Sequence, residues 1–200
     1  MEYRTEWLKH AGLMTRHLEI VLTAYSREIP DRPLSMLNIG VENGGSLEVW
    51  GKVLPEGSQI VGMDNDPACL ELGLNVLLGD VTNKSQITDL LRGEWFDVII
   101  DSTGTMSVHP WVFLRPGGVY IYEGFHPAMA SRLVEDLAYA NDSWLPIEEV
   151  IRASIWQGVL VVEKRNPTVV PYVEVMIGNF AEVVSEADLK AQGVRQVLVE

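Results

Sequence analysis

The sequence predicts an α/β fold built on a mostly parallel, doubly wound sheet of seven strands. Short apolar runs typical of buried strands alternate along the chain with stretches of helical periodicity. Turns containing Gly, Pro or Asp separate these segments. Three of the apolar runs are followed by an aspartate, which is typical of a sheet with a ligand edge. Alternation of this kind indicates parallel strands joined by right-handed crossovers, and therefore a Rossmann-like topology.

The expected elements divide the chain into three parts. Helical spacing over residues 5–28, ended near Pro30, predicts an N-terminal helical segment over residues 1–34. Residues 35–165 form the main domain. Its first five strands are expected at residues 34–40, 59–64, 75–80, 96–101 and 119–124. Helices are expected at residues 46–54, 67–73, 85–93 and 128–139, the third with Ser85 as its N-cap. Residues 148–156 and 158–165 predict a hairpin that closes the sheet.

The C-terminal residues, 166–200, show a different pattern. Two alternating runs flank Gly178-Asn179, which predicts a β-hairpin. A short helix over residues 185–193 and a last strand follow. This pattern predicts a small appendage that serves dimerisation or docking; a simple extension of the sheet edge is the alternative.

Composition limits the partners of the protein. The chain has 200 residues, 47% of them hydrophobic and 22% charged, which is typical of a soluble globular protein. Its net charge of −13 argues against nucleic acid and anionic membrane surfaces as main partners. One cysteine, Cys69, permits no intramolecular disulfide and fits a reducing compartment. A charged N-terminus and the lack of a long apolar run favour a cytoplasmic protein.

The ends of the first four expected strands indicate where a ligand binds. These strands end at Gly40, Asp64, Asp80 and Asp101. Because parallel strands bring their carboxyl ends to one edge of the sheet, the four residues are expected to lie close together. The sequence therefore predicts a ligand site at this edge.

The loop "GVENGG" at residues 40–45 limits the ligand further. Backbone N–H groups at the start of a helix favour a phosphate or a carboxylate. A dinucleotide site would require glycine at the second fingerprint position, but Glu42 stands there and would repel a pyrophosphate. S-adenosylmethionine instead has a carboxylate, an ammonium group, a sulfonium, a ribose and an adenine. Asp64 is suited to accept hydrogen bonds from the ribose hydroxyls, and Asp80 to accept one from the adenine amino group.

Five motifs together resemble the class I S-adenosylmethionine-dependent methyltransferases over about residues 35 to 165. They are "NIGVENGGSLEVW", "VGMDND", "GDVTN", "FDVIID" and "LRPGGVYIYE". The resemblance implies that S-adenosylmethionine is the cofactor. The cofactor-binding residues that it implies are Gly40, Glu42, Asn43, Gly44, Ser46, Asp64, Asn65, Asp80, Val81 and Asp101.

The form G-G-S-L-x-x-W is similar to a narrower branch of this superfamily. That branch contains cephalosporin-modifying and macrolide sugar O-methyltransferases, which implies O-methylation of a small-molecule hydroxyl. Those enzymes commonly read D-D-G-S-H and I-E-D at the ends of the fourth and fifth strands, and these acids hold Mg²⁺. Here Asp101 and Glu123 match one acid of each motif, but Ser102 and Gly124 replace the neighbouring acids.

The resemblance thus implies Mg²⁺ at Asp101 and Glu123, while the replacements predict no bound ion unless a substrate brings further oxygens. The implied catalytic residues are His109, Glu123 and Asp101, with His109 as the proton acceptor; His126 is a further candidate. Two other functions stay open, a non-catalytic methyltransferase-like binding or scaffold domain and an NAD-dependent oxidoreductase. The expected partners are a small-molecule substrate and a second copy of the chain, paired through the C-terminal appendage.

Overall fold

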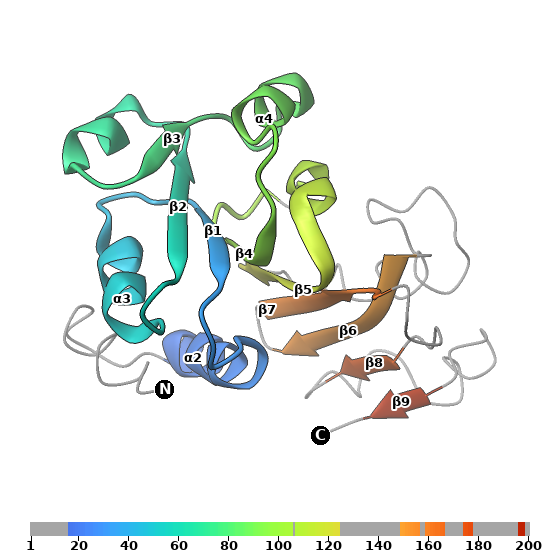
Figure 1. The fold of residues 1–200 in the computed structure, drawn as a ribbon. Helices are drawn as coiled ribbons and strands as arrows, with labels where there is room; N and C mark the ends of the chain where they lie inside the picture. Colours follow the sequence, from blue (N-terminus) through green and yellow to red (C-terminus); the bar gives the residue numbers. More distant parts are fainter. Residues whose placement is uncertain are drawn as a thin grey trace.

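A single mixed sheet organises the protein (Figure 1). The structure is a computed structural model that describes residues 16–105, 107–124, 149–156, 159–166, 174–177 and 196–198. Within the described residues the sheet has nine strands, and their order across the sheet is β3-β2-β1-β4-β5-β7-β6-β8-β9. The predicted α/β fold with a mostly parallel sheet is confirmed.

The first five strands are parallel and carry the crossover helices. They are β1 (Ser35–Ile39), β2 (Gln59–Asp64), β3 (Val76–Leu78), β4 (Phe96–Asp101) and β5 (Leu114–Glu123). Between them lie α3 (Gly45–Val53), the 3₁₀ helix η1 (Pro67–Leu72), α4 (Lys84–Leu90) and the 3₁₀ helix η2 (His109–Phe113). The predicted hairpin is present as β6 (Val150–Trp156) and β7 (Val159–Lys164), which are antiparallel.

Both faces of the sheet are covered by apolar side chains. The helix α2 (Arg16–Glu28) and α3 cover one face, where Tyr25 and Trp50 meet edge to face with ring centroids 4.8 Å apart. The other face packs against α4 and η2, with Ile87 and Trp111 buried. Successive residues of each strand alternate between these two layers. This alternation decides on which face each functional side chain lies.

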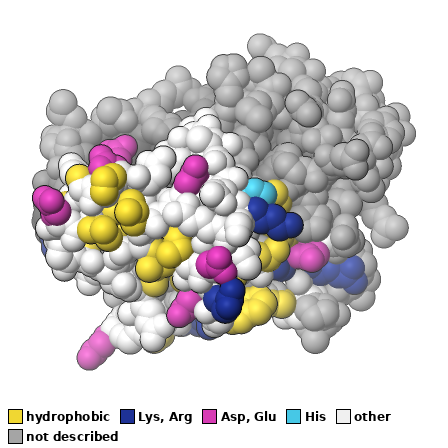
Figure 2. All heavy atoms as spheres, turned by 90° about the horizontal axis from the view of Figure 1, so that it is seen from above, with side chains coloured by type: hydrophobic (Ala, Val, Ile, Leu, Met, Phe, Trp, Pro, Cys, Tyr) yellow, Lys and Arg dark blue, Asp and Glu magenta, His cyan; other side chains and the backbone are white. Residues whose placement is uncertain are grey.

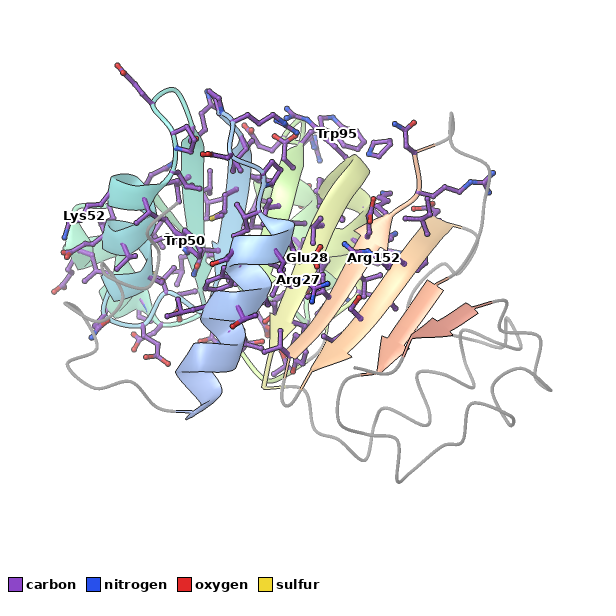
Figure 3. The ribbon with its side chains drawn as sticks, turned by 90° about the horizontal axis from the view of Figure 1, so that it is seen from below. Arg27, Glu28, Trp50, Lys52, Trp95 and Arg152 are labelled. Atoms are coloured by element: carbon purple, nitrogen blue, oxygen red, sulfur yellow. The ribbon has the colours of Figure 1, made fainter. Side chains whose placement is uncertain are left out.

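An ion-pair network fastens α2 to the antiparallel part of the sheet. Figure 3 shows α2 lying across one face of the sheet, with Glu28 directed towards Arg152 on β6. The Arg152 guanidinium donates to both carboxylate oxygens of Glu28, and its Nε donates to Glu163 at 3.1 Å. Only 5% of the Glu28 side chain is exposed, so Arg152 supplies the charge that this buried carboxylate needs.

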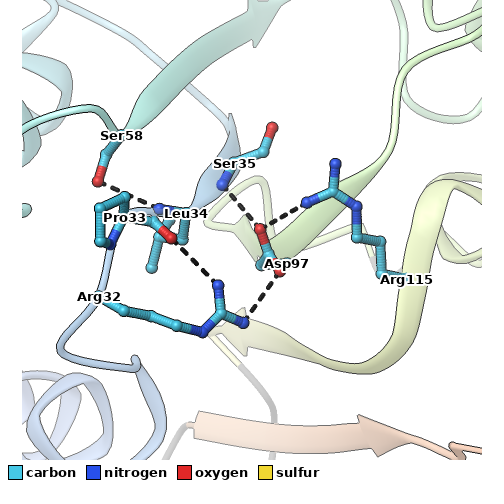
Figure 4. A network of polar contacts seen from close by, with 7 residues as sticks. All are labelled: Arg32, Pro33, Leu34, Ser35, Ser58, Asp97 and Arg115. Atoms are coloured by element: carbon cyan, nitrogen blue, oxygen red, sulfur yellow. Dashed lines mark hydrogen bonds and ion pairs between the residues drawn. The ribbon is translucent and has the colours of Figure 1, made fainter.

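A second network fixes the amino ends of β1 and β4, opposite the ligand edge (Figure 4). The carboxylate of Asp97 accepts from the Ser35 backbone N–H at 2.9 Å, from Arg32 at 3.1 Å and from Arg115 at 2.8 Å. Burial alone would raise the pKa of Asp97, but these partners hold it below its usual value. These contacts therefore stabilise the sheet at the amino ends of β1 and β4, away from the predicted ligand residues.

Three expectations differ from the structure. The C-terminal strands β8 (Glu174–Ile177) and β9 (Gln196–Leu198) pair in parallel with β6 and with each other, so these parts of the tail extend the sheet. β8 pairs with the edge of β6 that the hairpin leaves free, and β9 pairs with β8. The N-cap of α4 is Asn83 rather than Ser85, because its side chain accepts from the Gln86 backbone N–H. The strand β5 begins at Leu114, earlier than expected, with an irregular register near Phe96.

Several expected elements lie outside the described residues. They are the first part of the N-terminal helical segment, the helix at 128–139, the turn at Gly178-Asn179 and the helix at 185–193. The division into residues 1–34, 35–165 and 166–200 stays a prediction.

Candidate functional site

A cavity of about 270 Å³ opens at the carboxyl ends of the parallel strands. It lies where the loops after β1, β2, β3 and β4 meet, which is the edge that the sequence predicted. The lining residues are Ile39, Gly40, Glu42, Asp64, Asn65, Gly79, Asp80, Val81, Thr82, Ser102, Thr103 and Thr105. Six of the predicted cofactor-binding residues are thus brought together: Gly40, Glu42, Asp64, Asn65, Asp80 and Val81.

In the glycine-rich loop, Gly40 after β1 lies close to Ser102 after β4. Gly40 has φ of 85°, and a Cβ atom there would lie 2.5 Å from the Ser102 hydroxyl oxygen. Ser102 in turn donates to the backbone carbonyls of Ile39 and Gly40, at 3.0 and 3.2 Å. Glu42 also has a positive φ, 49°, which is uncommon for a residue with a side chain. Glu42 is exposed and lines the cavity.

Asp64, at the end of β2, connects the cavity to this loop. Its Oδ2 accepts from the backbone N–H groups of Val41 and Glu42, at 2.7 and 2.9 Å, and its Oδ1 accepts from the Asp66 N–H at 2.9 Å. Burial by itself would raise the pKa of Asp64, but these backbone hydrogen bonds lower it below its usual value. Asp64 is consequently an anion at neutral pH and keeps the loop in place.

Asp80 provides the third carboxylate of the cavity. Its Oδ1 accepts from the hydroxyl and the backbone N–H of Thr82, at 2.7 and 2.8 Å. The Thr82 hydroxyl, followed by its N–H, lowers the pKa of Asp80. The Asp80 backbone N–H donates to Gln86 on α4 at 3.0 Å, which fixes the segment after β3.

The remaining predicted loop residues lie behind the cavity wall. Asn43 accepts from the Gly45 backbone N–H at 3.2 Å, and Gly44 is the left-handed N-cap residue of α3. The hydroxyl of Ser46, in the first turn of α3, is buried and has no hydrogen-bond partner among the described residues. A buried hydroxyl without a partner costs free energy in the folded state.

The charge of the cavity is negative. Glu42, Asp64 and Asp80 line it, and no described residue of the lining is Lys, Arg or His. Figure 2 shows one face of the molecule, with acidic side chains in several places and Lys and Arg side chains towards the lower right. Such a cavity favours a ligand with cationic groups and disfavours one with phosphates.

Asp101, predicted as a catalytic, cofactor-binding and metal-binding residue, lies beneath the cavity and is fully buried. Its Oδ1 accepts from the Thr103 N–H at 2.9 Å and from the Thr103 hydroxyl at 2.6 Å. Its Oδ2 accepts from the Tyr120 hydroxyl at 2.8 Å. Both carboxylate oxygens are therefore engaged by protein groups.

Glu123 points to the opposite face of the sheet. Asp101 is in register with Tyr122, so alternation along β5 turns Glu123 towards the layer of α2. There it accepts a hydrogen bond from the Tyr25 hydroxyl, across 98 residues of sequence. Burial raises the pKa of Glu123 to about 7; the hydrogen bond from Tyr25 lowers it and the charge of Asp101 raises it further. Asp101 and Glu123 therefore do not converge on a common point.

His109 begins η2 and does not line the cavity. Its backbone N–H donates to the Ser107 hydroxyl at 3.3 Å, and its side chain is half-buried. His126 lies outside the described residues. Among the residues that the structure describes, no group of three or more His, Cys, Asp or Glu side chains is placed to hold a metal ion.

Sequence reasoning missed part of the lining. Thr82, Ser102, Thr103 and Thr105 all contribute hydroxyls to the cavity. Their signal was present, because Ser and Thr follow the strand-end acids in "GDVT" and "DSTGT". Loop residues lack periodicity, however, so the sequence does not show which of them face a cavity.

Comparisons with known proteins agree with this fold. No family model and no curated protein matches the chain. Among solved structures, the MycE methyltransferase from the mycinamycin biosynthetic pathway, in complex with Mg, SAH and mycinamycin VI, superposes with a TM-score of 0.66 at 18% identity. The alignment covers 96% of this chain and 59% of that one. The chain has the fold of an S-adenosylmethionine-dependent methyltransferase.

A second structure of MycE, in complex with Mg and SAH, supports the same methyltransferase fold. Its TM-score is 0.63 at 20% identity, with 96% of this chain and 55% of that one covered. The chain thus spans somewhat more than half the length of these two structures. Among the described residues, no helix is both long and apolar enough to cross a membrane.

Proposed function

We propose that this protein is an S-adenosylmethionine-dependent methyltransferase. The observation that carries the proposal is the cavity at the carboxyl edge, lined by Glu42, Asp64 and Asp80 without a positive charge. S-adenosylmethionine has a sulfonium, an ammonium group and hydroxyl and amino donors, and it has no phosphate. When bound, it supplies an electrophilic methyl group. The methyltransferase fold of the chain supports this assignment.

Each cavity residue has a distinct part in this proposal. Asp64 accepts from a ribose hydroxyl through the lone pair of Oδ1 that its backbone donors leave free. Asp80 and Val81 flank the adenine, with Asp80 accepting from its amino group. Glu42 attracts the ammonium group. The backbone N–H groups at the start of α3 take the carboxylate.

The acceptor is proposed to be the hydroxyl of a small molecule. The motif resemblance to macrolide sugar O-methyltransferases supports this, as does the net charge of −13, which disfavours nucleic acid. His109, at the start of η2, is the proposed proton acceptor. Pairing of two copies through residues 166–200 is also a proposal, since β9 is the last strand of the described sheet and an edge strand can pair further.

Titration calorimetry with S-adenosylhomocysteine and with NAD tests the proposed cofactor. Saturable binding of S-adenosylhomocysteine alone is expected. Binding of NAD alone would replace the proposal with an oxidoreductase.

A non-catalytic binding domain is the second candidate. It is favoured by the position of Asp101, Glu123 and His109, none of which lines the cavity. Such a domain would bind S-adenosylhomocysteine and transfer no methyl group to any member of a panel of hydroxylated small molecules. Transfer of a labelled methyl group to one of them would exclude it.

The residues present do not fit a Mg²⁺ site. Asp101 is buried with both oxygens engaged, and Glu123 faces the other side of the sheet. Ser102, where the related motif has an acid, uses its hydroxyl to donate to two carbonyls. Magnesium prefers six oxygens in octahedral array, and these carboxylates do not converge to begin one. The proposed reaction therefore uses no metal held by Asp101 and Glu123.

Restoring the acid should not restore metal binding. In Ser102→Asp, a carboxylate would face the carbonyls of Ile39 and Gly40, which it cannot donate to. We expect a loss of about 1–2 kcal/mol in unfolding free energy and no Mg²⁺ binding by calorimetry. Ser102→Ala is the matched control, because it removes the donor without adding charge. Saturable Mg²⁺ binding by the wild type or by Ser102→Asp would contradict this view.

A further inference from the structure

The segment after β4 forms a wall of hydroxyl groups on the cavity. Ser102, Thr103 and Thr105 line it, together with Asp64 and Asp80. A hydroxyl carries one proton and two lone pairs, so its partners determine what it offers to a ligand. The hydrogen bonds of this segment fix the direction of each proton.

The buried carboxylate of Asp101 sets this direction. Burial and the charge of Asp101 raise the pKa of Tyr120, so Tyr120 keeps its proton and donates to Oδ2. Oδ1 accepts the Thr103 backbone N–H, and the Thr103 hydroxyl lies 2.6 Å from the same atom. A carboxylate only accepts, so the Thr103 hydroxyl must donate its proton to Asp101.

The direction of the Thr103 hydroxyl proton determines the direction of the Thr105 hydroxyl proton. The hydroxyl oxygens of Thr103 and Thr105 are 2.7 Å apart. Because the Thr103 proton is used on Asp101, Thr105 must be the donor of this contact. The Thr105 backbone N–H also points to the Thr103 hydroxyl oxygen, at 3.3 Å. With its proton directed away, the Thr105 hydroxyl presents only lone pairs to the cavity.

From this chain of hydrogen bonds we infer that Thr105 is a cofactor-contacting residue that accepts a hydrogen bond from an N–H or O–H donor of the bound cofactor, with Thr103 and Asp101 as its positioning residues. The inference rests on the proposed function. It gives the buried Asp101 a role that needs no contact with a ligand. It also fits the rest of the lining, since Glu42, Asp64 and Asp80 likewise offer acceptors to a ligand rich in donors.

Calorimetry with S-adenosylhomocysteine and valine or serine variants tests the inference. Thr105→Val keeps the shape and removes the hydroxyl, and we expect its affinity to fall about two- to tenfold, as for one lost hydrogen bond. Thr105→Ser should bind like the wild type. Thr103→Val should lose less, because the freed Thr105 hydroxyl can still rotate to accept, and Thr103→Ser should restore wild-type binding. Thr88→Val is the matched control, since the Thr88 hydroxyl bonds only to the Lys84 carbonyl of its own helix.

Cofactor analogues separate a contact from a structural effect. Analogues of S-adenosylhomocysteine lacking the α-amino group, the adenine amino group or a ribose hydroxyl are titrated into the wild type and Thr105→Val. If Thr105 accepts from one of these donors, the difference between the two proteins vanishes for the analogue that lacks it. A difference that persists with every analogue, or the absence of any difference with S-adenosylhomocysteine itself, would overturn the inference alone. A wild type that does not bind S-adenosylhomocysteine would refute the proposed function as well.

Discussion

Replacing Asp64 with alanine is expected to weaken S-adenosylmethionine binding at least about tenfold. Hydrogen bonds to a charged acceptor contribute roughly 1.5–3 kcal/mol, and the carboxylate is proposed to accept from a ribose hydroxyl. The same substitution also removes the acceptor of the Val41 and Glu42 backbone N–H groups. The loop that carries Glu42 therefore loses its anchor along with the ligand contact. Titration calorimetry measures the affinity, and melting without ligand measures the loop effect.

Two matched variants make this test specific. Asp64→Asn keeps one acceptor oxygen and removes the charge, so its affinity should lie between those of wild type and Asp64→Ala. Asp66→Ala removes a neighbouring carboxylate that accepts from the Ala68 backbone N–H and does not line the cavity. Its affinity should equal that of the wild type. Equal affinity of Asp64→Ala and wild type would remove Asp64 from the site.

The ligand edge could be predicted because it follows from local patterns. Each parallel strand was marked by a short apolar run, and its end by a turn or an acid. Once the strands are parallel, their ends must meet, so Gly40, Asp64 and Asp80 came together at one cavity. The apolar runs also gave the bounds of β2 and β4 without error.

The faces of strand-end residues were harder to predict. Asp101 and Glu123 end neighbouring strands, and the motif resemblance implied that they share a metal ion. The two carboxylates lie on opposite faces because Asp101 pairs with Tyr122 and not with Glu123. Glu123 is one residue further along β5, so its side chain points to the other face of the sheet. Register across a sheet is set by contacts distant in sequence, and the motif pattern contains no information on it.

The partner of Glu123 could not be predicted either, because Tyr25 belongs to a helix that precedes the first strand.

The pair of Glu123 and Tyr25 leads to the second large expected effect, a dependence of stability on pH. Burial raises the pKa of Glu123 from its ordinary value of 4.5 to about 7. A carboxyl group with a raised folded-state pKa stabilises the fold fully below pH 4.5, and this stability is lost as pH rises through about 7. Each pKa unit corresponds to about 1.4 kcal/mol, and with a discount for the partial exposure of the residue we expect a loss of about 2–3 kcal/mol.

Glu123→Gln should remove this loss while it keeps an acceptor for the Tyr25 hydroxyl. The unfolding free energy of wild type and variant, measured with urea between pH 4.5 and pH 8, should differ by an amount that grows with pH in favour of Glu123→Gln. Groups common to both proteins cancel in this difference, and Asp64, Asp80 and Asp97, with lowered pKa values, titrate below the window.

In Tyr25→Phe the loss of the hydrogen bond removes a contribution that lowers the pKa of Glu123, so the loss of stability should shift to higher pH. A difference between wild type and Glu123→Gln that stays constant across this range would show that Glu123 is ionised throughout and that burial does not govern its charge.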